Sequence, residues 1–199
     1  SKFLSQITFE ENSNLQIIKK RSFSNIPIKS ILIPKSVKEI GERNFATCKF
    51  LEKVEFERGI EIEVIEKEMF DSIHLLYIWI PRSVKVISRR AFYFSQIQTL
   101  EFSEDSELEK IEKEAFFSAK ISSISFPKIV KNICDKAFFA SNINNFVIPS
   151  DFGFSFLKNE CFSNSNITSI SISNSCTKIS EKCFYGCTSL QKVEISGNS

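Results

Sequence analysis

The sequence predicts a repeat solenoid, a chain wound into stacked coils that each add one short strand to a parallel sheet. Two observations carry this prediction. Pairs of apolar residues, separated by one position, recur along the whole chain, and a column of phenylalanines runs between them. Successive pairs lie 22 to 24 residues apart. The pairs are Ile7/Phe9, Ile31/Ile33, Val54/Phe56, Ile78/Ile80, Leu100/Phe102, Ile124/Phe126, Phe146/Ile148, Ile170/Ile172 and Val193/Ile195.

Each apolar pair marks a strand, because a period of two residues turns one face inward. The connection back to the next pair is about twenty residues long, so neighbouring strands must run parallel. No coil can cover its own apolar edge, and the coils therefore stack. We expect about eight coils and a final strand. They form a single domain over residues 1–199, which we expect to be a fragment of a longer array.

The phenylalanine column predicts the core. It consists of Phe23, Phe45, Phe70, Phe92, Phe116, Phe138, Phe162 and Phe184. An aliphatic residue precedes each of them by five positions, as Ile111 precedes Phe116. Stacked coils would turn this column into a spine of rings, in which Phe116→Ala is among the most damaging changes. Ser88 and Asp135 suit helix N-caps, so the segment before each ring is expected to form a short helical turn.

The coils alternate in length. From the second inward strand residue to the next phenylalanine, the distance is 14 residues in one coil and 12 in the next, throughout the chain. Long coils carry acidic inserts such as residues 104–107. Only five glycines are present, so other residues must make the bends. We infer that the ancestral duplicating unit was a pair of coils.

The composition excludes several function classes. The chain has 42% hydrophobic and 25% charged residues, a net charge of +2 and a pI near 8.2. This balance predicts no strong attraction to nucleic acid or to an anionic membrane. No apolar run is long enough to insert into a bilayer, and the first residues do not form a secretory signal.

Three segments, residues 31–48, 78–92 and 179–190, resemble the BspA-type, or treponemal-class, leucine-rich repeat. Residues 31–48 and 78–92 carry its strand and its proline, and residues 78–92 and 179–190 carry its Ala-Phe or Cys-Phe step; Asn44 precedes the ring in the first segment. The glycine of the motif is present only at Gly41, and the cysteine that follows the ring only at Cys48 and Cys187.

This resemblance implies a leucine-rich repeat solenoid, a right-handed superhelix. A parallel β-sheet would line one face, with short helical or 3-10 turns and loops on the other. The family is associated with adhesion and ligand binding at cell surfaces or in secreted proteins, and it carries no catalytic residues. The resemblance therefore implies a cell-surface or secreted location and a protein that is not an enzyme.

The outward strand positions hold the first candidate site. The only Trp and one of three Tyr project from the fourth strand, and exposed Trp and Tyr are favoured binding anchors. The alternative is that Trp79 only covers nearby apolar surface such as Leu32. The candidate ligand-binding residues are Tyr77, Trp79, Leu32, Glu55, Thr99 and Glu101. A second candidate is the column Tyr93, Phe117 and Phe139, with Tyr185 further on; these rings could instead pack against the adjacent coils.

The other reactive residue types predict no chemistry. Cys161 and Cys183 occupy the small-residue position before the spine ring, where a thiol acts as a small hydrophobe; a disulfide between them is the alternative. The single His and the cysteine spacing predict no metal site, and no nucleophile motif or cofactor motif is present. Residues 166–168 form a glycosylation sequon, relevant only in a secreted protein.

Two functions remain open. The first is a recognition module that binds protein or glycan through the strand-lined concave face, as a surface adhesin or antigen does. The second is a structural spacer or stalk with no ligand of its own. A defined aromatic patch at Tyr77 and Trp79 favours the first, whereas a featureless polar face favours the second.

Overall fold

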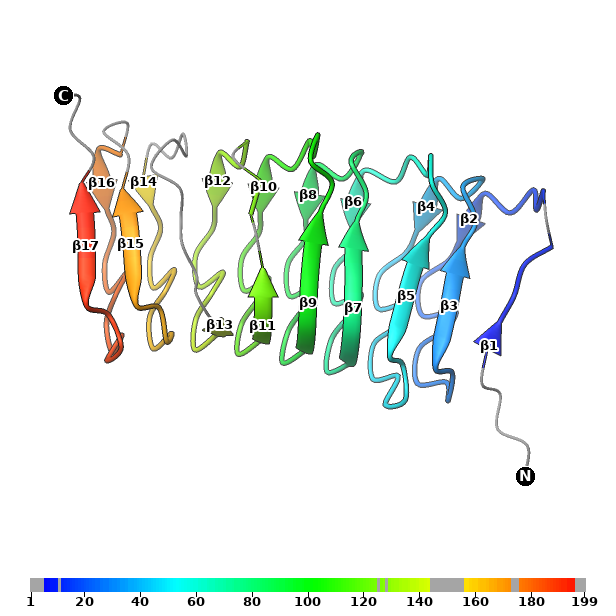
Figure 1. Cartoon of the computed structure of the whole chain (residues 1–199), viewed down its shortest axis with the longest axis horizontal. Helices are drawn as coiled ribbons and strands as arrows, with labels where there is room; N and C mark the ends of the chain where they lie inside the picture. The colour runs from blue at the N-terminus through cyan, green and yellow to red at the C-terminus, as the bar shows by residue number, and fades with distance from the viewer. Residues whose placement is uncertain are drawn as a thin grey trace.

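The computed structural model describes residues 6–10, 12–124, 126–127, 129–143, 156–172 and 176–195. The chain winds into a parallel β-solenoid whose longer strands stand side by side, with a second row of two-residue strands behind them (Figure 1). The predicted solenoid is therefore confirmed. The apolar pair Phe146/Ile148 lies outside the described residues.

Seven strands form the main sheet. In spatial order they are β1 (Gln6–Ile7), β3 (Ser30–Ile33), β5 (Lys53–Phe56), β7 (His74–Ile80), β9 (Gln96–Phe102), β11 (Lys120–Ile124) and β13 (Asn142–Ile143). All pairs are parallel, and the register joins equivalent positions of successive coils, as in Val54↔Ile78 and Ile78↔Leu100. The repeat columns of the sequence are therefore columns in space.

The short strands cover the opposite side of the core. They are β2 (Ile17–Ile18) paired with β4 (Glu39–Ile40), the four-stranded row β6 (Val64–Ile65), β8 (Val86–Ile87), β10 (Lys110–Ile111) and β12 (Asn132–Ile133), and β14 (Phe156–Leu157) paired with β16 (Lys178–Ile179). At the C-terminal end of the described chain, β15 (Ser169–Ile172) pairs with β17 (Lys192–Ile195).

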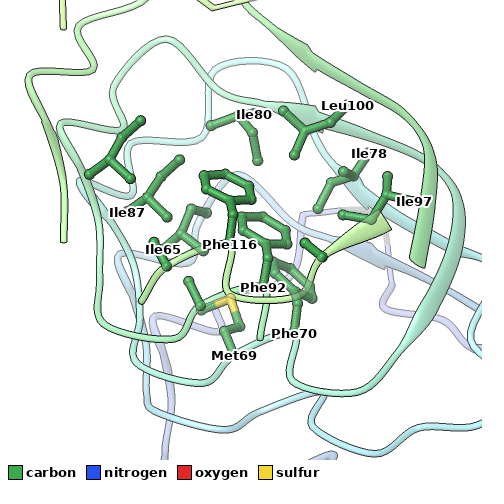
Figure 2. Close-up of a cluster of buried hydrophobic side chains, with 14 of the residues drawn as sticks. Ile65, Met69, Phe70, Ile78, Ile80, Ile87, Phe92, Ile97, Leu100 and Phe116 are labelled. Atoms are coloured by element: carbon green, nitrogen blue, oxygen red, sulfur yellow. The ribbon is translucent and has the colours of Figure 1, made fainter. Parts of the chain in front are cut away.

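The core is the predicted spine of phenylalanine rings. Eight rings stack in seven steps, from Phe23 to Phe184, with centroids 5.0 to 5.9 Å apart and planes within 4° to 18° of each other. The described residues make about seven turns, as the seven strands of the main sheet indicate, slightly fewer than the eight coils expected. Figure 2 shows three of the rings between the aliphatic side chains of the two rows of strands.

The expected helical turns before the rings are not formed, and the described residues contain no helix. Left-handed backbone is the reason. The residues two before and two after every spine ring have φ between 51° and 70°. They are Arg21, Arg43, Glu68, Arg90, Glu114, Lys136, Glu160 and Lys182 before the ring, and Asn25, Thr47, Ser72, Phe94, Ser118, Ala140, Asn164 and Gly186 after it.

A left-handed residue interrupts a right-handed turn and redirects the next N–H groups. The N–H of Phe116 donates to the carbonyl of Ala137 in the next coil at 2.8 Å, whereas the N–H of Phe117 donates within its own coil to Glu114 at 3.1 Å. Alternate N–H groups thus bind the neighbouring coil and the coil itself. Each turn is consequently one layer of a stack.

Ion pairs follow the two-coil alternation. At the left-handed position before the ring, a base in three of the short coils pairs with an acid in the long coil that follows. The pairs are Arg43 with Glu68, Arg90 with Glu114 at 2.6 Å and Lys136 with Glu160 at 3.3 Å.

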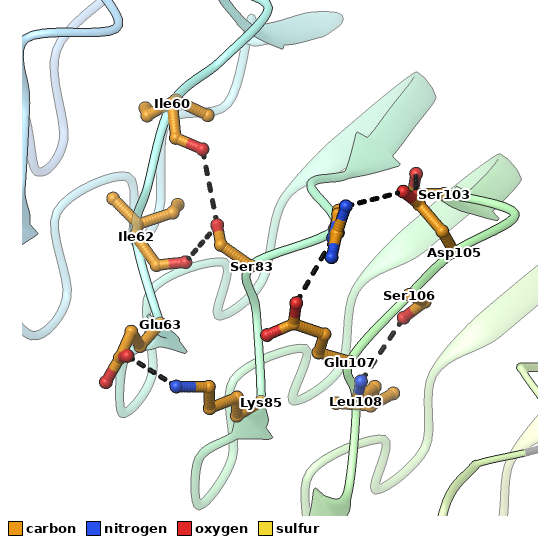
Figure 3. A network of polar contacts seen from close by, with 11 residues as sticks. Ile60, Ile62, Glu63, Ser83, Lys85, Ser103, Asp105, Ser106, Glu107 and Leu108 are labelled. Carbon is orange, nitrogen blue, oxygen red and sulfur yellow. Dashed lines mark hydrogen bonds and ion pairs between the residues drawn. The ribbon is translucent and has the colours of Figure 1, made fainter.

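The acidic inserts of the long coils are engaged in the same way. Lys85 pairs with Glu63 at 2.6 Å, and Arg82 pairs with Asp105 and Glu107, each at 3.1 Å (Figure 3). Both of these inserts therefore bond to a short coil beside them, and their carboxylates make contacts between coils.

Candidate functional site

Tyr77 and Trp79 project from β7 on the outer face of the main sheet. Ile78 and Ile80 on the same strand are fully buried, so the alternation turns the two aromatic side chains outward. Both rings are half-buried, and Trp79 rests partly on the core. The neighbouring β9 brings Thr99 opposite Tyr77 and Glu101 opposite Trp79.

One hydrogen bond organises this patch. The Tyr77 hydroxyl donates to Oε2 of Glu101 at 2.9 Å, reaching diagonally to the next strand. Burial, followed by this hydrogen bond and the charges of Glu101 and Glu55, raises the pKa of Tyr77. The phenol therefore remains a donor at neutral pH and fixes the direction of the carboxylate beside Trp79.

Leu32 and Glu55 lie together on the other side of the patch. They are register partners on β3 and β5. Strand β5 thus separates Leu32 from Trp79, and Leu32 remains 49% exposed. Lys53 holds Glu55 at 2.8 Å along the same strand. Trp79 therefore does not cover Leu32, although it does pack against the core beneath the sheet.

A hollow of about 430 Å³ opens beside Trp79. The hydrogen-bonded register of β5 with β7 ends at Val54↔Ile78, at the point where the hollow begins. Glu55 and Arg58 form part of its wall, together with Tyr77 and Trp79. Arg58 is exposed and has no ion pair among the described residues. Arg58 was not among the predicted site residues, which all lie at strand positions, because it follows the end of β5.

The second candidate column forms a ladder of rings on the turns. Tyr93 stacks on Phe117 at 5.1 Å, and Phe117 stacks on Phe139 at 4.8 Å. The rings face one another, so their faces are covered by adjacent coils, as in the packing alternative. Tyr185 lies outside this ladder because Ser163 takes the equivalent position in the coil before it. Phe94 adds an exposed edge against Tyr93.

The cysteines are free thiols. Burial raises the pKa of Cys183 to about 12 and raises that of Cys161 well above its ordinary value, so both stay neutral near pH 7. The thiols of Cys48 and Cys187 each donate to a spine carbonyl at 2.9 Å. Within the described ranges, no group of three His, Cys, Asp or Glu side chains could hold a metal ion.

The sequon residue Asn166 joins two coils. Its Oδ1 accepts the N–H of Ile143 at 2.7 Å, and its Nδ2 donates to the Asn142 side chain at 2.5 Å. The amide nitrogen that a glycan would modify is therefore engaged in the fold. In the part of the chain that the structure describes, no helix has the length and apolar character to cross a bilayer.

Solved structures of bacterial proteins superpose on this chain. The pneumococcal vaccine antigen PcpA superposes with a TM-score of 0.51 at 16% identity, over 93% of this chain and 61% of that one. A leucine-rich cell surface protein from Faecalibacterium prausnitzii gives 0.48 at 19% identity, over 98% and 70%. A leucine-rich repeat protein from Bacteroides ovatus gives 0.41 at 20% identity, over 96% and 63%. At these identities the likeness concerns the fold alone, and this chain spans less than two thirds of PcpA.

The comparison with curated protein sequences gives no match. The family model of the BspA type leucine rich repeat region matches this chain in six copies, over residues 1–116 and 109–199. These matches cover the entire sequence, and the strand columns and the ring spine are the repeat in three dimensions. The chain belongs to the BspA-type leucine-rich repeat family.

Proposed function

We propose that this chain is a non-catalytic recognition module that binds a protein or glycan through the outer face of its main sheet. The observation that carries the proposal is the patch at Tyr77 and Trp79. It combines two half-exposed aromatic side chains, a carboxylate held by a hydrogen bond and an adjacent hollow. Such a combination of aromatic anchor, fixed polar group and cavity is typical of binding surfaces.

Membership of the family supports a place at the cell surface or among secreted proteins. PcpA, which shares the fold, is described as a vaccine antigen. A surface location would present the strand face to protein or glycan ligands. The spacer function lacks a comparable observation, because a stalk needs no half-buried Trp beside a hollow.

The single Trp makes the proposal testable by fluorescence. Purified chain is titrated with panels of extracellular proteins and glycans while Trp emission is recorded, and binding is measured in parallel by calorimetry. We expect the ligand to shift the emission and Trp79→Ala to weaken binding by at least about tenfold, the usual loss at an interface anchor.

Phe50→Ala is the matched control, because Phe50 is an exposed aromatic residue outside the patch. It should bind as the unmodified chain does. A ligand that binds Trp79→Ala with undiminished affinity would place recognition elsewhere. A chain that binds no member of either panel would favour the spacer.

A further inference from the structure

The carboxylate beside Trp79 lacks the partner that its counterparts have. Three outward positions in this strand column hold glutamate: Glu55, Glu101 and Glu194. Lys53 pairs with Glu55 at 2.8 Å and Lys192 with Glu194 at 2.6 Å, in each case from two residues earlier on the same strand. The equivalent position on β9 is Thr99, so Glu101 has no cation at this place.

The bond that Glu101 does make leaves its charge uncompensated. Its partner is the neutral Tyr77 hydroxyl, which occupies Oε2. Among the described residues no Lys or Arg pairs with Glu101, and its exposed position leaves Oε1 accessible to a donor from outside. The position thus provides a fixed negative charge on a surface where neighbouring glutamates are neutralised internally.

The indole of Trp79 offers the second contact. Trp79 and Glu101 are register partners, so their backbones lie about 4.8 Å apart. Cations stand over Tyr93, Phe139 and Phe156 elsewhere in the described chain, but none stands over Trp79. A cation within about 6 Å of an indole and within hydrogen-bond reach of a carboxylate gains from both interactions.

We propose that the partner of this face is a protein that presents a Lys or Arg side chain, whose cation packs on Trp79 and pairs with Glu101. This inference rests on the proposed recognition function and names the group that is recognised. Arg58 bounds the hollow on the β5 side of Trp79 and repels a cation there, which confines the partner's charge to the β9 side. Tyr77 is a positioning residue, because it acts on the partner only through Glu101.

The test uses two tripeptides as probes, acetyl-Gly-Arg-Gly-amide and its uncharged analogue with citrulline in place of arginine. Trp emission of the full chain reports binding of each. We expect the arginine peptide to bind at least about tenfold more tightly than the citrulline peptide, the scale of a charge-assisted hydrogen bond. Glu101→Gln should abolish that preference while its amide oxygen still accepts the Tyr77 hydroxyl.

The matched control is Glu55→Gln, which removes the same charge from the same column where Lys53 already compensates it. This variant should keep the preference for arginine to within about twofold. Tyr77→Phe should lower the affinity for the arginine peptide less than Glu101→Gln does, because the Glu101 carboxylate remains. Near-ultraviolet circular dichroism of each variant verifies that the fold is retained.

Equal affinity for the two peptides, or an undiminished preference in Glu101→Gln, would overturn the inference. So would a chain to which neither peptide binds. The proposed function fails separately. If a protein or glycan no longer binds Trp79→Ala but still binds Glu101→Gln, the proposed recognition function stands and the proposed Lys or Arg partner is wrong.

Discussion

Phe116 is the most informative place to perturb the ring spine. Its side chain is fully buried, and it stacks on Phe92 at 5.0 Å and on Phe138 at 5.1 Å. Truncation to alanine removes both stacking contacts and leaves a cavity that coils on either side cannot close. We expect Phe116→Ala to lower the free energy of unfolding by about 3–5 kcal/mol.

Phe184 supplies the internal comparison. It is half-buried and stacks on one described ring, Phe162, at 5.8 Å. Phe184→Ala should therefore cost about 2 kcal/mol less than Phe116→Ala. Urea denaturation followed by circular dichroism gives both values, and the m-value reports whether the coils still unfold together. If Phe116→Ala does not fold, Phe116→Leu should show roughly half the loss.

Equal losses of stability in Phe116→Ala and Phe184→Ala would show that the loss does not depend on how many rings each position contacts. A small loss at Phe116 together with an unchanged m-value would contradict the prediction as well. Either result would mean that the strand ladders, and not the ring spine, hold the coils together.

Three further predictions concern the backbone and the thiols. Thr47 is exposed with a φ of 59°, so Thr47→Gly should raise the free energy of unfolding by about 1 kcal/mol in urea titrations, and a loss would contradict the cost assigned to left-handed residues. A Cβ at Gly41 would lie 2.5 Å from the backbone nitrogen of Lys20, so Gly41→Ala should cost about 1–3 kcal/mol, as thermal melting can verify; a neutral change would contradict the close approach. Because burial raises the pKa of Cys183 to about 12, the unfolded chain loses this proton first, and stability should fall as pH rises from about 9 toward 12, by at most about 1.4 kcal/mol per pH unit. Urea titrations of Cys183→Ala should lack that part of the alkaline loss, and identical pH profiles would contradict it.

The columns were predictable because each one repeats a single physical requirement. Ile78 and Leu100 occupy equivalent inward positions, and the sheet joins them in register. The outward direction of Tyr77 and Trp79 followed from the same alternation. In a repeat of this kind the neighbours in space can be predicted from the sequence, because a residue one period away lies on the adjacent strand.

The turns were not predictable in the same way. Arg90 and Phe94 adopt left-handed backbone that is ordinarily assigned to glycine or asparagine, so their identities give no local signal. The redirected N–H groups find partners only when the next coil is present, as Phe92 finds Ala115. Stacking therefore decides the turn, and a single coil cannot reveal it.

The residues of the candidate site could be predicted from the sequence, but the hydrogen bond and the hollow that connect them could not. The hydrogen bond from Tyr77 to Glu101 runs diagonally between strands and depends on the side-chain rotamers of both residues. The hollow depends on where the ladder between β5 and β7 ends. The spacing of the repeat predicts neither the hydrogen bond nor the hollow.

The alternating ion pairs determine which changes in length the array tolerates. Loss of the single coil that carries Glu114 would break its ion pair with Arg90 and bring Arg90 beside Lys136, a like charge, while Lys136 keeps its own pair with Glu160. Loss of two adjacent coils would instead restore a base next to an acid. Insertions and deletions should therefore be accepted in units of 46 or 47 residues, and an engineer who lengthens this protein should add coils by twos.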